Sequence, residues 1–357
     1  MKIEASLEKF IFRCSCCLLA SMVFLSCMEA RTAVRRDPPE RVEEAIRPPA
    51  IDRAVERVKA NGAEIGKYFV TGENDQIAVK ADIREGDAEF EVQYDIEEWD
   101  DSETPPAGES LLVRFSVEDK RTGERQAASF RWRIPEDAAG ILLAFDDDYR
   151  QTWEEYFDIL DDYGARATYF VQGELSDFCF RALSRGHDIG YHTINHLNLP
   201  KVSAGEFYYE TTSDIDSFRR AGVPIKAFAY PFGLSEPWMR EALTSAFAIQ
   251  RGFGVTFRVY SAEDIRKGYI ASRSIDNILF QEEESFEAVI TGMFRTLKFL
   301  GGERVLPITT HDISDTAQWG IKPRRLEYLL RAARFFKLKF YRYSDFFPDP
   351  PGTGPAE

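Results

Sequence analysis

The chain of 357 residues is long enough for one catalytic domain of about 200 to 250 residues and a smaller module. Apolar residues make up 44% and charged residues 29% of the sequence, which is typical of a globular protein and excludes a disordered chain. The formal net charge of −15 and the lack of a strong basic run exclude nucleic-acid binding, because nothing in the sequence neutralises phosphates. The sequence contains no coiled-coil heptad, so it does not indicate an oligomeric state.

Residues 1–27 have the pattern of a secretory signal. Lys9 and Arg13 precede a short apolar stretch at residues 14–26, which is shorter than the roughly 20 residues of a permanent transmembrane helix. Phe-Leu-Ser-Cys at residues 24–27 resembles a bacterial lipobox, whose cysteine carries lipid in the mature protein. The pattern predicts export and a membrane anchor through lipid on Cys27, with plain secretion or an uncleaved anchor as the alternatives.

Residues 28–66 are rich in Arg, Glu and Pro, which predicts a tether. A short helix near residues 51–60 is expected to interrupt it. Between residues 77 and 134, apolar side chains recur at every second position in four stretches. This pattern predicts four antiparallel strands, in a β-sheet module at residues 67–135.

Two details of this module have a specific interpretation. Lys-Arg-Thr-Gly at residues 120–123 is a turn sequence, and it predicts a hairpin between the third and fourth strands. Phe130 and Trp132 alternate along the fourth strand. Aromatic residues at such positions form a core more often than a sugar-binding platform, so a packing role is favoured.

After Pro135 the pattern changes to short apolar runs that alternate with amphipathic helices, which is typical of a β/α fold with parallel strands. We expect a distorted (β/α) barrel of about seven strands at residues 136–348, followed by a disordered tail at 349–357. The strands that can be placed are at residues 141–145, 167–171, 188–191, 227–230 and 305–310. The helices are expected at residues 203–222, with a capping box at Ser203 and Glu206, and at 285–300 and 323–336.

Acidic and histidine residues follow two of the expected strands. Asp146, Asp147 and Asp148 follow the first, and three adjacent carboxylates are costly unless a cation binds them. Three solvated loop acids are the alternative. His192 and His196 are spaced i, i+4, which we expect to place both imidazoles on one face of a helical turn, suited to a single metal ion.

Three of the 4 histidines of the chain are clustered in the sequence. His187, His192 and His196 lie within one short segment, and His311 follows the strand expected at residues 305–310. Clustering of a rare residue favours metal binding over chance. Because histidine titrates near neutral pH, His311 is a candidate general acid, and a structural histidine at a strand end is the alternative.

Three sequence motifs, taken together and in this order, resemble those of the polysaccharide deacetylases of carbohydrate esterase family 4. Ala-Phe-Asp-Asp-Asp at residues 144–148 is similar to the family's Thr-Phe-Asp-Asp-Gly motif. Ala-Thr-Tyr-Phe-Val-Gln-Gly at 167–173 is similar to its second strand. Gly-His-Asp-Ile-Gly-Tyr-His-Thr-Ile-Asn-His at 186–196 is similar to its metal-binding segment. The resemblance covers about residues 140–347.

The resemblance implies a role for each of five residues. Asp147, His192 and His196 bind one divalent metal ion, commonly zinc. Asp146 becomes the general base, and His311 protonates the departing amine. The implied reaction is the removal of N-acetyl groups from a cell-envelope or extracellular glycan, which needs an activated water, charge stabilisation and a proton donor.

Other positions depart from the family pattern. Phe-Ala-Tyr-Pro-Phe-Gly at residues 228–233 is similar to the variant of the third motif that lacks its arginine, and there the resemblance implies that the backbone N–H of Phe232 helps to hold the oxyanion. Ala229 stands where many members have an arginine that orients the base, and Arg273 is the expected replacement. Asp148 replaces a glycine, and the Trp-containing fourth motif has no counterpart. These departures leave two alternatives open: a catalytically inactive glycan-binding lipoprotein, and a metal-dependent hydrolase of a non-sugar amide.

Overall fold

The protein is described by a computed structural model. The described residues are 49–61, 68–73, 76–95, 108, 110–134 and 139–348. The predicted signal, the lipid anchor on Cys27, most of the predicted tether and the predicted tail lie outside these residues. Among the described helices, none combines the length and the apolar content that crossing a membrane requires.

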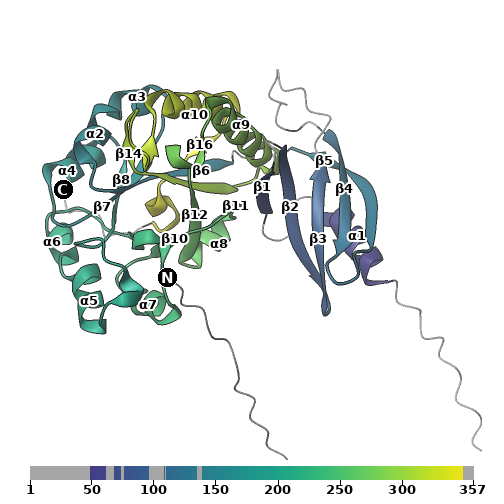
Figure 1. Ribbon diagram of the computed structural model, residues 1–357, viewed down its shortest axis with the longest axis horizontal. Helices are drawn as coiled ribbons and strands as arrows, with labels where there is room; N and C mark the ends of the chain where they lie inside the picture. The colour runs from purple at the N-terminus through teal and green to yellow at the C-terminus, as the bar shows by residue number, and fades with distance from the viewer. Residues whose placement is uncertain are drawn as a thin grey trace, which may run out of the picture. The chain divides into compact units, whose positions relative to one another are not determined.

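The β-sheet module is an antiparallel sheet of six strands in the order β11-β1-β2-β3-β4-β5 (Figure 1). The four predicted strands are observed as β2 (Gln76–Glu85), β3 (Ala88–Asp95), β4 (Ser110–Asp119) and β5 (Arg125–Arg133). The two further strands are β1 (Tyr68–Glu73) and β11 (Phe257–Val259). The predicted hairpin joins β4 to β5, where the N–H of Gly123 donates to the carbonyl of Asp119 at 2.8 Å.

The core of the module lies between helix α1 (Ala50–Asn61) and the apolar face of the sheet. Helix α1 buries Ile51, Ala54 and Val58 in a cluster with the inward residues of the sheet. Near the C-terminal end of β5, the ring of Trp132 lies 5.9 Å from the ring of Phe299. The Nε1 of Trp132 donates a hydrogen bond to the carbonyl oxygen of Phe299 at 2.8 Å. Trp132 therefore has the predicted packing role, and the structure adds that its partner is Phe299 at the end of helix α9 (Glu283–Leu300).

The region after the β-sheet module is a closed barrel of seven parallel strands in the order β6-β7-β8-β9-β10-β12-β13, with β13 pairing back to β6. The strands are β6 (Gly140–Asp147), β7 (Ala167–Val171), β8 (Asp188–Tyr191), β9 (Ala227–Ala229), β10 (Ile249–Phe253), β12 (Tyr269–Ser274) and β13 (Val305–Thr310). The short strand β16 (Lys339–Phe340) pairs with the start of β6. The predicted architecture is confirmed, although the positions of β10 and β12 were not predicted.

Helices surround these strands, as Figure 1 shows for α2, α3, α9 and α10. They are α2 (Arg150–Glu155), α3 (Phe157–Asp162), α4 (Asp177–Ser184), α5 (Ala204–Thr212), α6 (Ile215–Arg220), α7 (Pro237–Ala242), α8 (Ala262–Arg266), α9 (Glu283–Leu300) and α10 (Pro323–Phe335). The predicted helix at 203–222 is divided into α5 and α6, and Ser203 caps α5 by accepting a hydrogen bond from the N–H of Glu206 at 3.3 Å.

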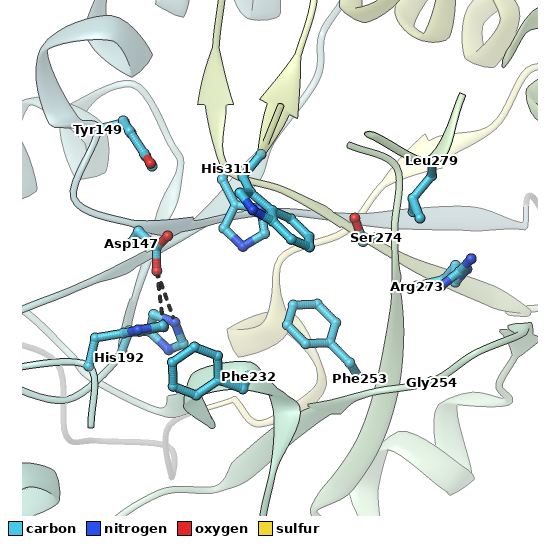
Figure 2. Close-up of a pocket in the computed structure, with 12 residues that line it drawn as sticks. Asp147, Tyr149, His192, Phe232, Phe253, Gly254, Arg273, Ser274, Leu279 and His311 are labelled. Atoms are coloured by element: carbon cyan, nitrogen blue, oxygen red, sulfur yellow. Dashed lines mark ion pairs between the residues drawn. The ribbon is translucent and has the colours of Figure 1, made fainter. Parts of the chain in front are cut away.

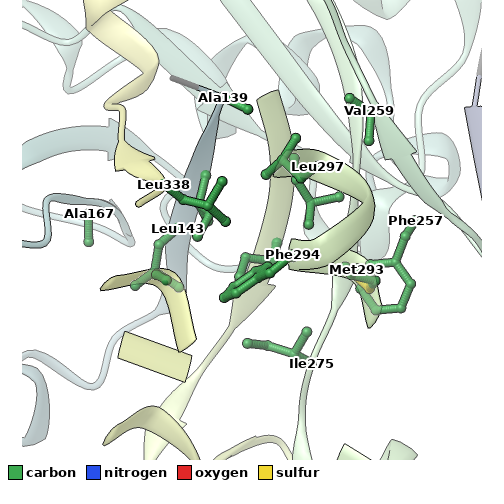
Figure 3. Close-up of a cluster of buried hydrophobic side chains, with 14 of the residues drawn as sticks. Ala139, Leu143, Ala167, Phe257, Val259, Ile275, Met293, Phe294, Leu297 and Leu338 are labelled. Atoms are coloured by element: carbon green, nitrogen blue, oxygen red, sulfur yellow. The ribbon is translucent and has the colours of Figure 1, made fainter. Parts of the chain in front are cut away.

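The short elements are η1 (Leu199–Lys201), η2 (Pro231–Gly233), η3 (Asn277–Leu279), η4 (Tyr343–Phe346), β14 (Asp312–Ile313) and β15 (Gly320–Ile321). The core between α9 and the barrel is fully apolar at its centre. Figure 3 shows Phe294 and Leu297 of α9 beside Leu143 of β6 and Leu338. This packing fixes the strands whose ends form the site.

Candidate metal centre and active site

The predicted site residues come together at the carboxyl ends of the barrel strands. Asp147 ends β6, His192 follows β8, and His311 follows β13. Together with His196 and Phe232 they line one cavity of about 500 Å³ (Figure 2). Parallel strands in a closed barrel all end at the same rim, which is why segments far apart in the sequence meet here.

Three of these residues form a cluster that suits a metal ion. The Oδ1 of Asp147 lies 3.4 Å from the Nε2 of His192 and 3.3 Å from the Nε2 of His196 (Figure 2). The ligand atoms of the three side chains all lie within 4.8 Å of one another. One carboxylate oxygen and two imidazole nitrogens fit a divalent ion of the zinc type, with coordination positions left for water and substrate.

The segment that carries the two histidines is not helical, so the predicted helical turn was wrong. Thr193 and His196 adopt positive φ angles of 70° and 53°, and an irregular loop brings the two rings within 4.9 Å. The buried carboxylate of Glu210 holds this loop, accepting from the N–H of Asn195 at 2.8 Å and from its Nδ2 at 2.7 Å. The sequence did not reveal Glu210, because it lies on α5 and reaches the loop only in the folded chain.

Hydrogen bonds orient two of the ligands. The Nδ1 of His192 lies 2.8 Å from the carbonyl oxygen of Ala229. A carbonyl only accepts, so Nδ1 carries a proton, and Nε2 is the ring nitrogen that faces the cluster. The Nε2 of Gln172 donates to the Oδ1 of Asp147 at 3.0 Å, which fixes the carboxylate.

Burial and charge set the protonation states of the ligands. Burial raises the pKa of Asp147, but the hydrogen bond and charge of His192 outweigh it and leave this pKa well below its ordinary value. Burial, followed by repulsion from His192, lowers the pKa of His196. An ionised carboxylate and a neutral imidazole are the forms that bind a metal.

Asp146 lies inside the barrel, because successive side chains of β6 point in opposite directions. It forms a fully buried ion pair with Arg251 of β10, whose guanidinium lies 5.0 Å from the ring centre of Phe170 and 4.6 Å from that of Phe253. The Oδ1 of Asp146 is buried and has no hydrogen-bond partner in the described part of the chain. Arg251, and not the predicted Arg273, therefore replaces the missing arginine of the third motif.

We expect Arg251→Met to lower the free energy of unfolding by about 3 to 5 kcal/mol, because it leaves the Asp146 carboxylate buried without a counter-charge. Urea denaturation of the purified protein measures this change. The double variant Arg251→Met/Asp146→Asn is expected to recover much of the loss, since it buries no unpaired charge. A single variant as stable as the unmodified protein would contradict the role assigned to this pair.

His311 is also held by a buried carboxylate. Its Nδ1 lies 2.8 Å from the Oδ2 of Asp276, which also accepts from Ser274 at 2.5 Å, while the other oxygen accepts from Thr310 at 2.8 Å. Burial lowers the pKa of His311, but the hydrogen bond and charge of Asp276 outweigh it and raise this pKa to about 9. His311 is therefore protonated at neutral pH. Asp276 follows β12, a strand that was not located from the sequence.

Comparison with known proteins agrees with this geometry. Residues 134–247 match the family model of the polysaccharide deacetylases. This part of the chain is similar to that family. A peptidoglycan-N-acetylglucosamine deacetylase from Bacillus cereus is 35% identical over 71 residues, which are 18% of this chain and 33% of that protein. The chain therefore matches about a third of the length of this curated relative.

The chain is also similar to solved structures. The Xyl-CE4 domain of a multidomain xylanase from the hindgut metagenome of Trinervitermes trinervoides is 18% identical, with a TM-score of 0.42, covering 59% of this chain and 90% of that one. A chitin deacetylase from Colletotrichum lindemuthianum is 16% identical, with a TM-score of 0.43, covering 61% and 92%. A peptidoglycan deacetylase from Bacillus subtilis is 18% identical, with a TM-score of 0.41, covering 58% and 90%.

The departures of this chain from the family pattern leave the cavity open. Asp148 points away from the cavity and pairs with Arg150, whose Nε lies 2.6 Å from its Oδ1, so its charge is compensated. Phe232 has a positive φ of 58°, is 55% exposed and packs its ring 4.6 Å from that of His196. Trp319, which sequence reasoning did not single out, also lines the cavity.

Proposed function

We propose that this protein is a metal-dependent hydrolase that removes N-acetyl groups from a cell-envelope or extracellular polysaccharide. The observation that supports the proposal most directly is the content of one rim of the barrel. The cluster of Asp147, His192 and His196 lies at this rim. The buried ion pair of Asp146 and Arg251 and the protonated His311 lie at the same rim. These are the parts that hydrolysis of an amide requires, because an amide is a weak electrophile with a poor leaving group.

Each part has a task in the proposed reaction. Asp147, His192 and His196 would hold a divalent metal, which we propose is zinc and which would supply the Lewis acidity that activates water and the acetyl carbonyl. Asp146 accepts the proton of the attacking water on its unpaired Oδ1, while Arg251 holds its other oxygen. The backbone N–H of Phe232 supports the oxyanion, and His311 donates its proton to the departing nitrogen, with Asp276 positioning the ring.

The proposed function predicts acetate release that depends on metal. We expect the purified protein to release acetate from N-acetylglucosamine oligomers, to lose at least about 90% of this activity on chelation, and to regain it when zinc is added. Acetate is measured by an enzyme-coupled assay. Release that is unaffected by a chelator would contradict the metal-dependent mechanism. Bound metal without release from any acetylated glycan would instead favour a glycan-binding protein or a non-sugar amidase.

We also propose that the chain is exported and anchored to a bacterial envelope membrane through lipid on Cys27. The support is the sequence pattern of residues 1–27 alone. Mass spectrometry of the mature N-terminus tests it. A lipid-modified Cys27 at the N-terminus is the expected result, and an unmodified or uncleaved N-terminus would contradict the anchor.

A further inference from the structure

Arg273 is a cavity residue that the proposed mechanism does not use. It lies near the end of β12 and lines the same cavity as the metal-ligand cluster and His311. Figure 2 shows it on the far side of the cavity from Asp147 and His192. The cavity thus has a site for the acetyl group on one side and a guanidinium on the other.

Within the described part of the chain, the guanidinium of Arg273 has neither a hydrogen bond nor an ion pair. It lies 6.0 Å from the ring centre of Phe257, which shields it from water but adds no counter-charge. Burial lowers the pKa of Arg273, and no nearby carboxylate opposes this effect. A partly buried cation in this state is costly unless a ligand compensates it.

Other arginines around the site do have anionic partners. Arg251 pairs with Asp146, Arg150 with Asp148, and Arg325 with Glu283, the last with its Nε 2.9 Å from Oε2. Carboxylates neutralise these three arginines, whereas no carboxylate is paired with Arg273 in the described part of the chain. Asp147 is the one carboxylate among the described residues that line the cavity, and it belongs to the metal cluster.

We propose that Arg273 binds a carboxylate of the substrate, so that the enzyme prefers an acidic N-acetylated glycan to a neutral one. This inference rests on the proposed function and adds the substrate class. The planar guanidinium matches a carboxylate with two parallel hydrogen bonds. Since the acetamide must reach the metal cluster, the carboxylate belongs to another position on the same sugar or to the neighbouring sugar.

The acidic character of the whole chain does not prevent such binding. The net charge of −15 repels an anionic polymer at long range, but salt screens exposed charges beyond about 8 Å at physiological ionic strength. A contact in a partly buried cavity is screened much less. Local recognition by one cation can therefore coexist with an acidic surface.

Binding to the metal-depleted protein tests this inference separately from turnover. The ligands are a neutral N-acetylglucosamine hexamer, a hexasaccharide that alternates glucuronate with N-acetylglucosamine, and a glycan fragment whose acetylated sugar itself carries a carboxylic acid ether. The variants are Arg273→Gln, Arg273→Lys and, as a control for charge, Arg181→Gln, which removes an exposed arginine of α4 paired with Glu154. Affinities are measured by calorimetry.

We expect Arg273→Gln to weaken binding of at least one acidic ligand about tenfold and to change binding of the neutral hexamer less than about twofold. Arg273→Lys should recover part of the loss, and Arg181→Gln should resemble the unmodified protein. The acidic ligand that responds shows whether the carboxylate lies on the acetylated sugar or on its neighbour. Equal effects on acidic and neutral ligands, or none, would overturn the inference.

Acetate release from the same ligands by the metal-loaded protein separates this inference from the proposed function. Binding that depends on Arg273, without release from any ligand, overturns the deacetylase function and leaves the carboxylate site standing. Release from the neutral hexamer together with binding that is insensitive to Arg273 overturns the carboxylate site and leaves the deacetylase function standing.

Discussion

Asp147→Ala is expected to remove bound metal and to lower kcat for acetate release by at least about a thousandfold. Asp147 supplies the negative charge in a ligand set whose other two members are imidazoles. Without it, two neutral ligands remain, and Gln172, which donates to the Asp147 carboxylate, is itself uncharged and cannot replace it. Metal content by mass spectrometry and initial rates of acetate release measure the two effects.

Asp148→Ala is the matched control for this experiment. It removes the same group one residue further along, but the Asp148 carboxylate is paired with Arg150 and does not line the cavity. We expect it to keep its metal and to retain activity within about threefold. An Asp147→Ala protein with unchanged metal content and unchanged hydrolysis would disprove the assignment of the metal centre.

Asp276→Asn is expected to move the basic limb of the pH–rate profile to lower pH by at least about one unit. The raised pKa of about 9 means that His311 is a proton donor below this pH and loses that form as the pH rises through it. Removing the Asp276 charge leaves burial, which lowers the pKa of His311, opposed only by the smaller effects of the Asp146 and Asp147 charges. At pH 8 a shift of one unit lowers kcat by about twofold and a shift of two units by about tenfold, and the loss should shrink as the pH is lowered.

A profile of kcat against pH from 5 to about 10 measures this shift. Asp315→Asn serves as the control, because it removes an exposed acid four residues after His311 without touching the ring. Its basic limb should stay where it is in the unmodified protein. If Asp276→Asn reduces kcat equally at every pH, then Asp276 only supports the structure and does not tune the acid.

The regular part of the fold was predicted because its signals are local. Strands β7 and β13 lie at the residues expected from their largely apolar runs, because both faces of a buried strand are apolar along its whole length. Strands β10 and β12 were not predicted, because neither has an uninterrupted apolar run. Each contains an arginine, Arg251 or Arg273, which interrupts the apolar run that marks a buried strand.

The sequence by itself determined which residues gather as metal ligands and acid–base candidates, because rare histidines and adjacent acids follow recognisable strands in a characteristic order. Only the tertiary structure decided how they are held. Asp146 meets Arg251 across 105 positions of the chain, and His311 meets Asp276 across 35. Such pairs depend on which strand ends become neighbours when the barrel closes, and on which way each side chain points there. Neither property is encoded in spacing along the chain.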